Sequence, residues 1–262
     1  MANVIYDNFY LSNEVEDQFE SHLDLMRFCT VDNSLVGVAG DTKKIRVYSA
    51  TNATEKLAMG EGNTQNIEVK YAEKEYTILL AQNRFPYYDE EAMRDPLVVD
   101  TGVRHMTTDM FNTTQADVFA EYNKATQTVT LSGTDYFGAF VDAVAMLPGE
   151  NQEEREVFAF VHPNDKAAIR KALKDDLKYV EAYVRAGYIG TVAGVNLYTK
   201  MDAVEGTICG GTKAAVTFFN KKGTEVEQER DANIRLNEVY SRKYYMAAMT
   251  DERECFKIVK GN

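Results

Sequence analysis

Residues 95–124, DPLVVDTGVRHMTTDMFNTTQADVFAEYNK, decide the fold. Asp95 is a good helix N-cap residue, Pro96 suits the first helical position, and no other proline occurs before Lys124. Apolar residues then recur mostly three or four positions apart, at Val99, Val103, Met106, Met110, Val118 and Tyr122. This spacing predicts a helix over 96–123, about 42 Å long. Because Gly102 and several threonines weaken it, the helix needs tertiary packing along its length.

The segment before this helix, residues 37–80, reads as a two-stranded ribbon. Thr42–Ser49 and Asn66–Tyr71 alternate apolar and polar residues, as strands do. The apolar positions then switch from odd to even numbers, which predicts a bulge or break between Ala72 and Glu75. Residues 50–65 are polar and contain glycine, so they form the tip of the ribbon. Because a two-stranded ribbon is marginal alone in water, we expect it to rest on another surface, which another subunit can provide.

The remaining segments predict a mixed α+β protein without an internal repeat. Within an N-terminal arm, residues 13–28 have helical spacing, and the arm can pack on its own domain or reach a neighbour. A helix capped by Thr134 or Asp135 and ended by Pro148 precedes a buried strand, Val157–Val161, and a helix opened by Pro163. One more helical segment is expected over 177–185. Strands follow at 191–198, 214–219, 225–230, 235–240, 244–249 and 256–259.

Composition excludes several classes of protein. The 262 residues carry 41 acidic and 29 basic side chains, a formal net charge of −12, which argues against general nucleic-acid binding. Cys29, Cys209 and Cys255 are far apart and form no CxxC pair, so we expect reduced, buried thiols. No signal peptide and no bilayer-length apolar run occur in the sequence, so no membrane partner is expected.

A search for catalytic chemistry leaves one weak candidate. His162 lies where a strand meets a helix and could act as a catalytic acid or ligand, but it more simply flanks a helix cap provided by Asn164 or Asp165. The stretch 206–213, GTICGGTK, lacks the residue order of a phosphate-binding loop and is better explained as a turn between strands. Glu225, Glu227 and Glu229 alternate on one strand, which indicates a solvated or ion-paired face. No catalytic, cofactor-binding or metal-binding residue is therefore assigned.

The order of the segments resembles the major capsid proteins of tailed bacteriophages, the Hong Kong 97 fold family, which encapsulins share. The similar segments are 36–42 before the ribbon, 59–62 with 67–70 at its tip and return strand, the long helix, 157–165 with 190–196, and 223–227 through 242–245. The resemblance implies an α+β capsid fold with an N-terminal arm (1–36) and an extended E-loop ribbon (37–80). It further implies a P domain with a spine helix (81–131), an α/β A domain (132–223), and strands returning through both domains (224–262).

What the resemblance implies for function is a structural role and not an enzyme. The chain would self-assemble into hexamers and pentamers of an icosahedral shell around double-stranded DNA, in the virion capsid, after assembly in the host cytoplasm. Its partners would be copies of itself, a portal protein and a separate scaffolding protein, because the spine helix begins too early to leave room for a fused scaffold. No cofactor is implied. The subunit interface would include the E-loop tip, at Lys56, Leu57, Met59, Gly60, Glu61 and Gly62.

Two other functions stay open at this point. A nanocompartment shell protein of the encapsulin type shares the fold. An α+β enzyme using His162 is the more distant alternative.

Overall fold

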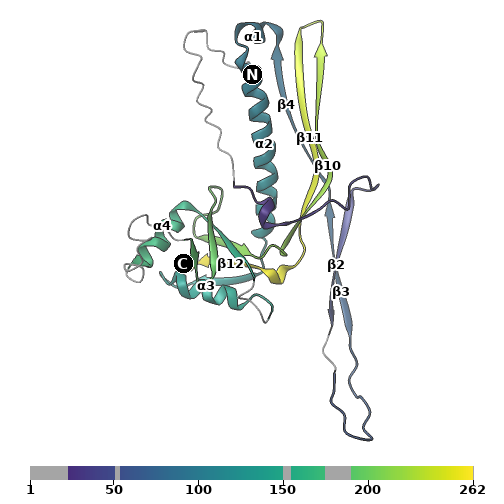
Figure 1. Ribbon diagram of the computed structural model, residues 1–262, viewed down its shortest axis with the longest axis vertical. Helices are drawn as coiled ribbons and strands as arrows, with labels where there is room; N and C mark the ends of the chain where they lie inside the picture. The colour runs from purple at the N-terminus through teal and green to yellow at the C-terminus, as the bar shows by residue number, and fades with distance from the viewer. Residues whose placement is uncertain (1–22, 51–53, 150–154, 175–189, 262) are drawn as a thin grey trace.

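The computed structural model describes residues 23–50, 54–149, 155–174 and 190–261. The molecule is elongated and has three parts (Figure 1). One is a rod, in which the long helix α2 lies against a four-stranded sheet. The second is a six-stranded domain beside the lower end of that helix. The third is a two-stranded ribbon that points away from both.

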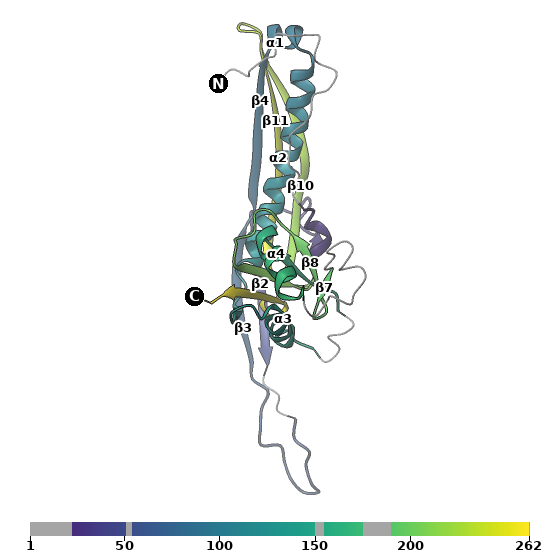
Figure 2. The same cartoon turned by 90° about the vertical axis from the view of Figure 1, so that its left-hand side faces the viewer.

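The rod is built from segments distant in sequence. Its sheet has the order β1-β10-β11-β4, with β1 parallel to β10 and the other pairs antiparallel. The strands are β1 (Thr30–Asp32), β4 (Leu79–Tyr88), β10 (Val216–Asp231) and β11 (Leu236–Met249). The helices are α1 (Asp89–Arg94), which was not predicted, and α2 (Leu97–Tyr122). Figure 2 shows α2 running along the sheet for most of the length of the rod.

The predicted long helix is confirmed, with one correction at its start. Pro96 is the N-cap, and Asp95 lies one position earlier, where its side chain still accepts a hydrogen bond from the Leu97 amide at 3.0 Å. Met106, Met110, Val118 and Tyr122 are buried. Only glycine fits at position 102 without a shift of Phe85, because a Cβ there would lie 2.3 Å from the Phe85 ring. The residue that weakens the helix therefore lets it approach β4.

Four short strands predicted near the C-terminus are two long ones. β10 continues through 216–231 and β11 through 236–249, with register shifts between Asn220 and Glu225. β10 is buried near Val216 and mostly exposed toward Asp231, whereas β11 changes from alternating buried and half-buried positions to an unbroken buried run. The hydrophobic pattern therefore changes within each strand. In the sequence, such a change of pattern within one long strand is indistinguishable from the boundary between two short strands.

The six-stranded domain has the sheet order β5-β12-β9-β6-β8-β7. Its strands are β5 (Gln127–Leu131), β6 (Val157–Val161), β7 (Thr191–Val192), β8 (Val195–Thr199), β9 (Thr207–Gly211) and β12 (Cys255–Lys260). The predicted helices are α3 (Tyr136–Ala145) and α4 (Pro163–Ala172). Asp135 caps α3 by accepting a hydrogen bond from the Gly138 amide at 2.9 Å. The segment predicted as a helix over 177–185 lies outside the described residues.

The turn predicted over 206–213 is wrong, because Thr207–Gly211 form the buried strand β9. β9 pairs antiparallel with both β6 and β12. A Cβ on Gly210 would lie 2.3 Å from the Phe158 carbonyl oxygen, and one on Gly211 would lie 2.2 Å from that of Glu254. The two glycines therefore permit close approach of neighbouring backbones and do not mark a turn.

An aromatic cluster joins the end of α2 to the six-stranded domain. Phe28, Tyr122, Phe158 and Phe160 are all buried, with ring centroids 4.8 to 5.7 Å apart. The Tyr122 hydroxyl donates a hydrogen bond to the Phe28 carbonyl at 2.8 Å. Phe28 ends a short 3-10 helix, η2 (Met26–Phe28), which lies within the last part of the helix predicted over 13–28. Residues 13–22 of that prediction lie outside the described residues.

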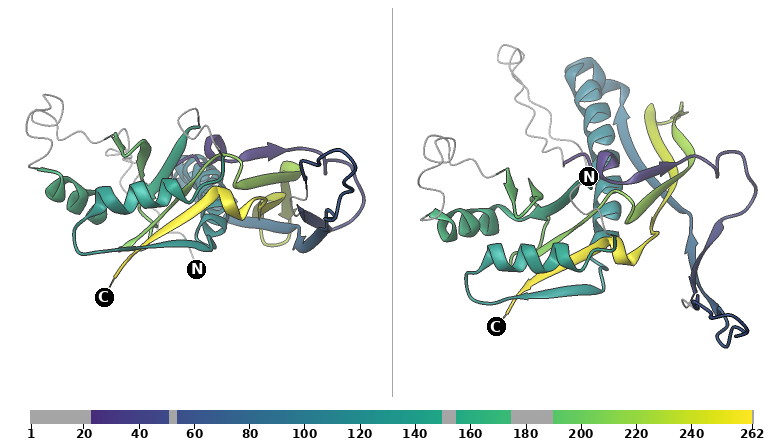
Figure 3. Two further views of the ribbon diagram at one scale, coloured as in Figure 1. Left: turned by 90° about the horizontal axis from the view of Figure 1, so that it is seen from below. Right: turned by 60° about the horizontal axis from the view of Figure 1, so that its bottom comes forward.

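The ribbon consists of β2 (Thr42–Ala50) and β3 (Val69–Thr77). The long connection between them, residues 51–68, is called the excursion. The predicted break between Ala72 and Glu75 is wrong, since the register runs without interruption from Thr42–Thr77 to Ala50–Val69. The apolar positions switch because the two ends of β3 use opposite faces. Tyr76 packs toward the rod, whereas Val69 and Tyr71 are exposed on the other face. Both views in Figure 3 show the ribbon extending away from the six-stranded domain.

Candidate assembly surfaces

The base of the ribbon is fixed to the rod. Ile45 and Tyr76 pack against Phe219, Met246 and Ala248 of β10 and β11. The Lys43 ammonium lies 3.8 Å from the centre of the Phe219 ring and 3.4 Å from the Asp32 carboxylate. Lys74 pairs with Glu252 further out along β3. These contacts set the direction in which the ribbon leaves the subunit.

Beyond its base, the ribbon exposes apolar side chains on one face. Tyr48 and Tyr71 are direct cross-strand partners with ring centroids 6.2 Å apart, and they are 63% and 67% exposed. Val69 continues the same face and is also exposed. A charged belt precedes them, where Glu73 pairs with Lys44 at 2.8 Å and Arg46 at 3.3 Å. A tyrosine pair held in place but left uncovered is suited to docking on another surface.

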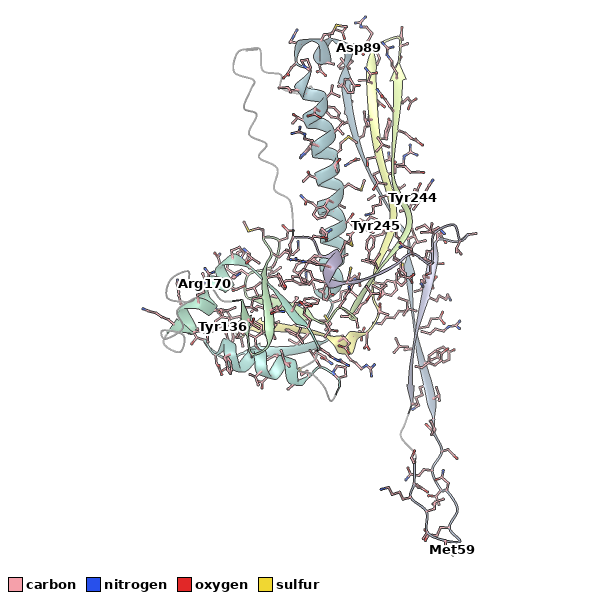
Figure 4. All side chains as sticks on the ribbon, in the orientation of Figure 1. Met59, Asp89, Tyr136, Arg170, Tyr244 and Tyr245 are labelled. Carbon is pink, nitrogen blue, oxygen red and sulfur yellow. The ribbon has the colours of Figure 1, made fainter. Side chains whose placement is uncertain are left out.

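The tip predicted as an interface is an ordered turn at the far end of the ribbon. The Glu61 amide donates to the Ala58 carbonyl at 3.1 Å, the Glu61 carboxylate accepts from the Ala58 amide at 3.2 Å, and Gly60 has a φ of +93°. Leu57 and Met59 are exposed, and Figure 4 shows Met59 at the extremity of the molecule. Lys56, Gly60, Glu61 and Gly62 are exposed beside them.

Behind the turn, Glu55 holds the two chains of the excursion together. Its carboxylate accepts hydrogen bonds from the Thr64 amide at 3.0 Å and from the Thr64 hydroxyl at 2.7 Å. These bonds lower the pKa of Glu55. The tip is therefore a shaped surface whose apolar side chains face solvent.

The opposite end of the molecule carries an ion-pair cluster that the sequence did not reveal. Asp89 accepts hydrogen bonds from Asn237 at 2.6 Å and Arg230 at 2.7 Å, which together lower its pKa. Arg235 pairs with Glu90 at 2.5 Å, and Arg84 pairs with Glu238. The cluster ties α1 to the β10–β11 hairpin, and Figure 4 places Asp89 far from Met59. Its members are too far apart in sequence for their spacing to indicate it.

The candidate His162 has a structural task. It is itself the N-cap of α4, with its Nδ1 accepting a hydrogen bond from the Asn164 amide at 3.2 Å. The prediction that Asn164 or Asp165 caps this helix is wrong, because Asp165 instead accepts a hydrogen bond from the Gly206 amide at 2.8 Å.

The acidic residues of β10 form ion pairs. Glu227 pairs with Arg242 at 2.7 Å and Glu225 pairs with Lys222 at 2.6 Å, so the predicted ion-paired face is confirmed.

Among residues 23–50, 54–149, 155–174 and 190–261, no group of three or more His, Cys, Asp or Glu residues is placed to hold a metal ion. No described helix is both long and apolar enough to cross a membrane.

Comparisons with known proteins agree with the arrangement of rod, domain and ribbon. No model of a known protein family matches the chain. The chain is 26% identical over 269 aligned residues to the major capsid protein of Staphylococcus phage phiMR11. The alignment covers 96% of this chain and 92% of the relative.

Solved phage capsids share the fold. The capsid protein of cyanophage P-SCSP1u matches with a TM-score of 0.70 at 15% identity, over 96% of this chain and 92% of that one. The structure from Mycobacterium phage Che8 matches with a TM-score of 0.69 at 14% identity, over 98% of both chains. The chain is thus similar in sequence to a phage major capsid protein and has the α+β, Hong Kong 97-type fold of the solved phage capsids.

Proposed function

We propose that the chain is the major capsid protein of a tailed phage and builds the wall of its virion capsid. Copies of it form the hexamers and pentamers of an icosahedral shell. The rod then corresponds to the P domain, the six-stranded domain to the A domain, and the ribbon to the E-loop. The role is structural, without catalysis.

The observation that carries this proposal is the ribbon. It is fixed at its base by Ile45 and Tyr76, yet it leaves Tyr48, Tyr71 and Met59 exposed to solvent. Met59 lies at the far end of the projection (Figure 4). Exposed apolar side chains on a projecting ribbon fit a surface on another molecule. A repeated contact of this kind, made head to tail between identical subunits, forms a ring when the rotation between neighbours closes.

The other partners follow from the same proposal. The shell encloses double-stranded DNA without reading its sequence, and the net charge of −12 per copy weakens adhesion of DNA to the wall. A separate scaffolding protein guides assembly in the host cytoplasm, and a portal protein occupies one vertex.

Deletion of residues 54–65 tests the role of the ribbon. The intact chain, co-expressed with a scaffolding protein, should give closed shells, tubes or rings by negative-stain electron microscopy. The deletion variant should remain folded by circular dichroism and elute as a monomer in size-exclusion chromatography. Normal shells from the deletion variant would contradict the assignment of the tip as an interface.

The nanocompartment alternative is less favoured, because the relative found by sequence is a phage protein. The two functions differ in what the shell contains. Nuclease-protected DNA in particles from infected cells supports a capsid, whereas a co-purified enzyme cargo supports a nanocompartment. The enzyme hypothesis loses its candidate, since His162 caps a helix.

A further inference from the structure

A hollow of about 510 Å³ lies between α2 and the outer part of the rod sheet. Its apolar lining includes Val103, Met106, Met110, Val226 and Val239. It arises because α2 packs mainly on β4 and β11 and leaves β10 less covered. Val103 and Val226 are 42% and 66% exposed, so the apolar rim is open to solvent.

The backbone beside this hollow is also unpaired. β1 covers the outer edge of β10 only from Thr217 to Phe219. From Asn220 to Asp231, that edge pairs with no strand in the described part of the chain. An extended segment laid on the edge would gain backbone hydrogen bonds and place alternate side chains over the hollow.

Two polar groups in the lining lack the partners they need. The side-chain oxygen of Asn220 is buried and accepts no hydrogen bond. The Lys243 ammonium lies over the rings of Phe218 and Tyr245, 5.3 and 5.7 Å from their centres, and forms no ion pair with any described residue. Burial lowers the pKa of Lys243. A matching ligand would bring a hydrogen-bond donor and a carboxylate among apolar groups.

The first described residues of the chain lie beside this hollow. Asp24 and Met26 line it, and the Leu25 amide donates to the Gln115 side chain at 2.7 Å, which anchors the chain there. The 22 residues before Leu23 include Val4–Leu11, VIYDNFYL. In an extended conformation Ile5, Asp7, Phe9 and Leu11 share one face, so three apolar side chains flank one carboxylate. The eleven residues from 12 to 22 reach about 36 Å when extended and about 16 Å as a helix, enough to return to the hollow either way.

We propose that residues 4–11 of the N-terminal arm bind in this hollow of their own subunit as an added strand on β10, with Asp7 facing Lys243. The pairing within one subunit is favoured because the short connection keeps the local concentration of the arm high. The docking completes the rod sheet and does not depend on the formation of a shell. Failure of one of these two proposals therefore leaves the other standing.

Disulfide trapping in the full chain tests the position of the arm. Ile5→Cys is combined with Val226→Cys, which lines the hollow, or with the control Glu225→Cys on the opposite face of β10. The native thiols of Cys29, Cys209 and Cys255 are buried, and burial raises each of their pKa values, so they should not compete. Isotope-labelled and unlabelled proteins are mixed before mild oxidation, and linked peptides are identified by mass spectrometry.

The expected result is a bond between positions 5 and 226 within one chain, formed at least about tenfold faster than the bond to position 225. Equal rates at 225 and 226 would overturn the proposal. Links between labelled and unlabelled chains would also overturn it, because they would place the arm on a neighbouring subunit.

Limited proteolysis tests the charge pairing independently. Chymotrypsin sites at Tyr6, Phe9 and Tyr10 should be cut several times faster in Asp7→Asn and in Lys243→Met, with no further increase in the double variant. Asp17→Asn, which removes the same charge outside the docked segment, should leave cleavage unchanged. Equal effects of Asp7→Asn and Asp17→Asn would contradict a contact with Lys243.

Discussion

At the scale of single residues, Gly210 and Gly211 are positions where an added Cβ would meet backbone atoms of neighbouring strands. Gly210→Ala should destabilise the protein by about 1–3 kcal/mol, because its Cβ would meet the Phe158 carbonyl oxygen, which belongs to the backbone and cannot rotate away. Urea unfolding followed by circular dichroism measures the change. The matched control is Gly223→Ala, where nothing lies within 4 Å of the new Cβ. Equal stability of the two variants would contradict the close approach described for β9.

The three buried thiols predict a loss of stability in alkali. Burial raises the pKa of Cys29 to about 11 and of Cys209 and Cys255 to about 12, above the ordinary value of 9.0. Since the folded state holds these protons more tightly, their contribution is complete below about pH 9 and is lost as the pH rises toward 12. Each thiol should lower the free energy of unfolding by about 1.4 kcal/mol per pH unit in that window.

Cys209→Ser provides the control for this pH dependence. Serine does not titrate there and preserves a hydroxyl donor for Asn123, which the Cys209 thiol contacts at 2.8 Å. The variant should show a slope that is smaller by about 1.4 kcal/mol per pH unit between roughly pH 9 and 11. An unchanged slope would mean that the thiol at 209 is not responsible.

At the scale of elements, a side-chain hydrogen bond joins α2 to β11. The Tyr245 hydroxyl donates to the Asp117 carboxylate at 2.5 Å. Tyr245→Phe should cost about 1.5–3 kcal/mol, the range for a bond to a charged group. Thermal unfolding checks the loss, with Tyr244→Phe as the neighbouring control on the other face of β11. Similar losses in both variants would indicate that ring packing, and not this bond, holds the helix.

Elements with internal sequence signals could be predicted, and elements defined by their surroundings could not. The long helix, α3, α4 and β6 carry caps, prolines or an unbroken apolar run. The glycines of β9 predict a turn from the sequence, but they serve neighbouring strands that lie about 50 residues away on either side in sequence. At the tip, composition predicts a loop and the resemblance implies an interface at Met59 and its neighbours, whereas the Tyr48–Tyr71 pair required the register of the ribbon.

At the scale of the whole molecule, the ribbon should matter for association and not for the stability of the subunit. Replacing both Leu57 and Met59 by serine should leave the melting temperature unchanged, because both side chains are exposed in the subunit. If each is buried on assembly, the loss is about 1.5–3 kcal/mol per side chain. The protein concentration needed for assembly should therefore rise at least about tenfold.

Light scattering across a dilution series measures that threshold. Gln65→Ser alters a polar residue of the same excursion and should assemble like the unmodified chain. A double variant that assembles at the original concentration would show that these two side chains stay uncovered in the particle.

The position of β12 has a consequence for the order in which the molecule is made. Cys255–Lys260 lie between β5 and β9, so the last strand of the chain occupies an interior place in the six-stranded sheet. Its partner β5 is synthesised more than 100 residues earlier. The sheet therefore stays incomplete until β12 has left the ribosome. Long-range pairing of this kind folds slowly, so the competent subunit appears only after β12 has been synthesised.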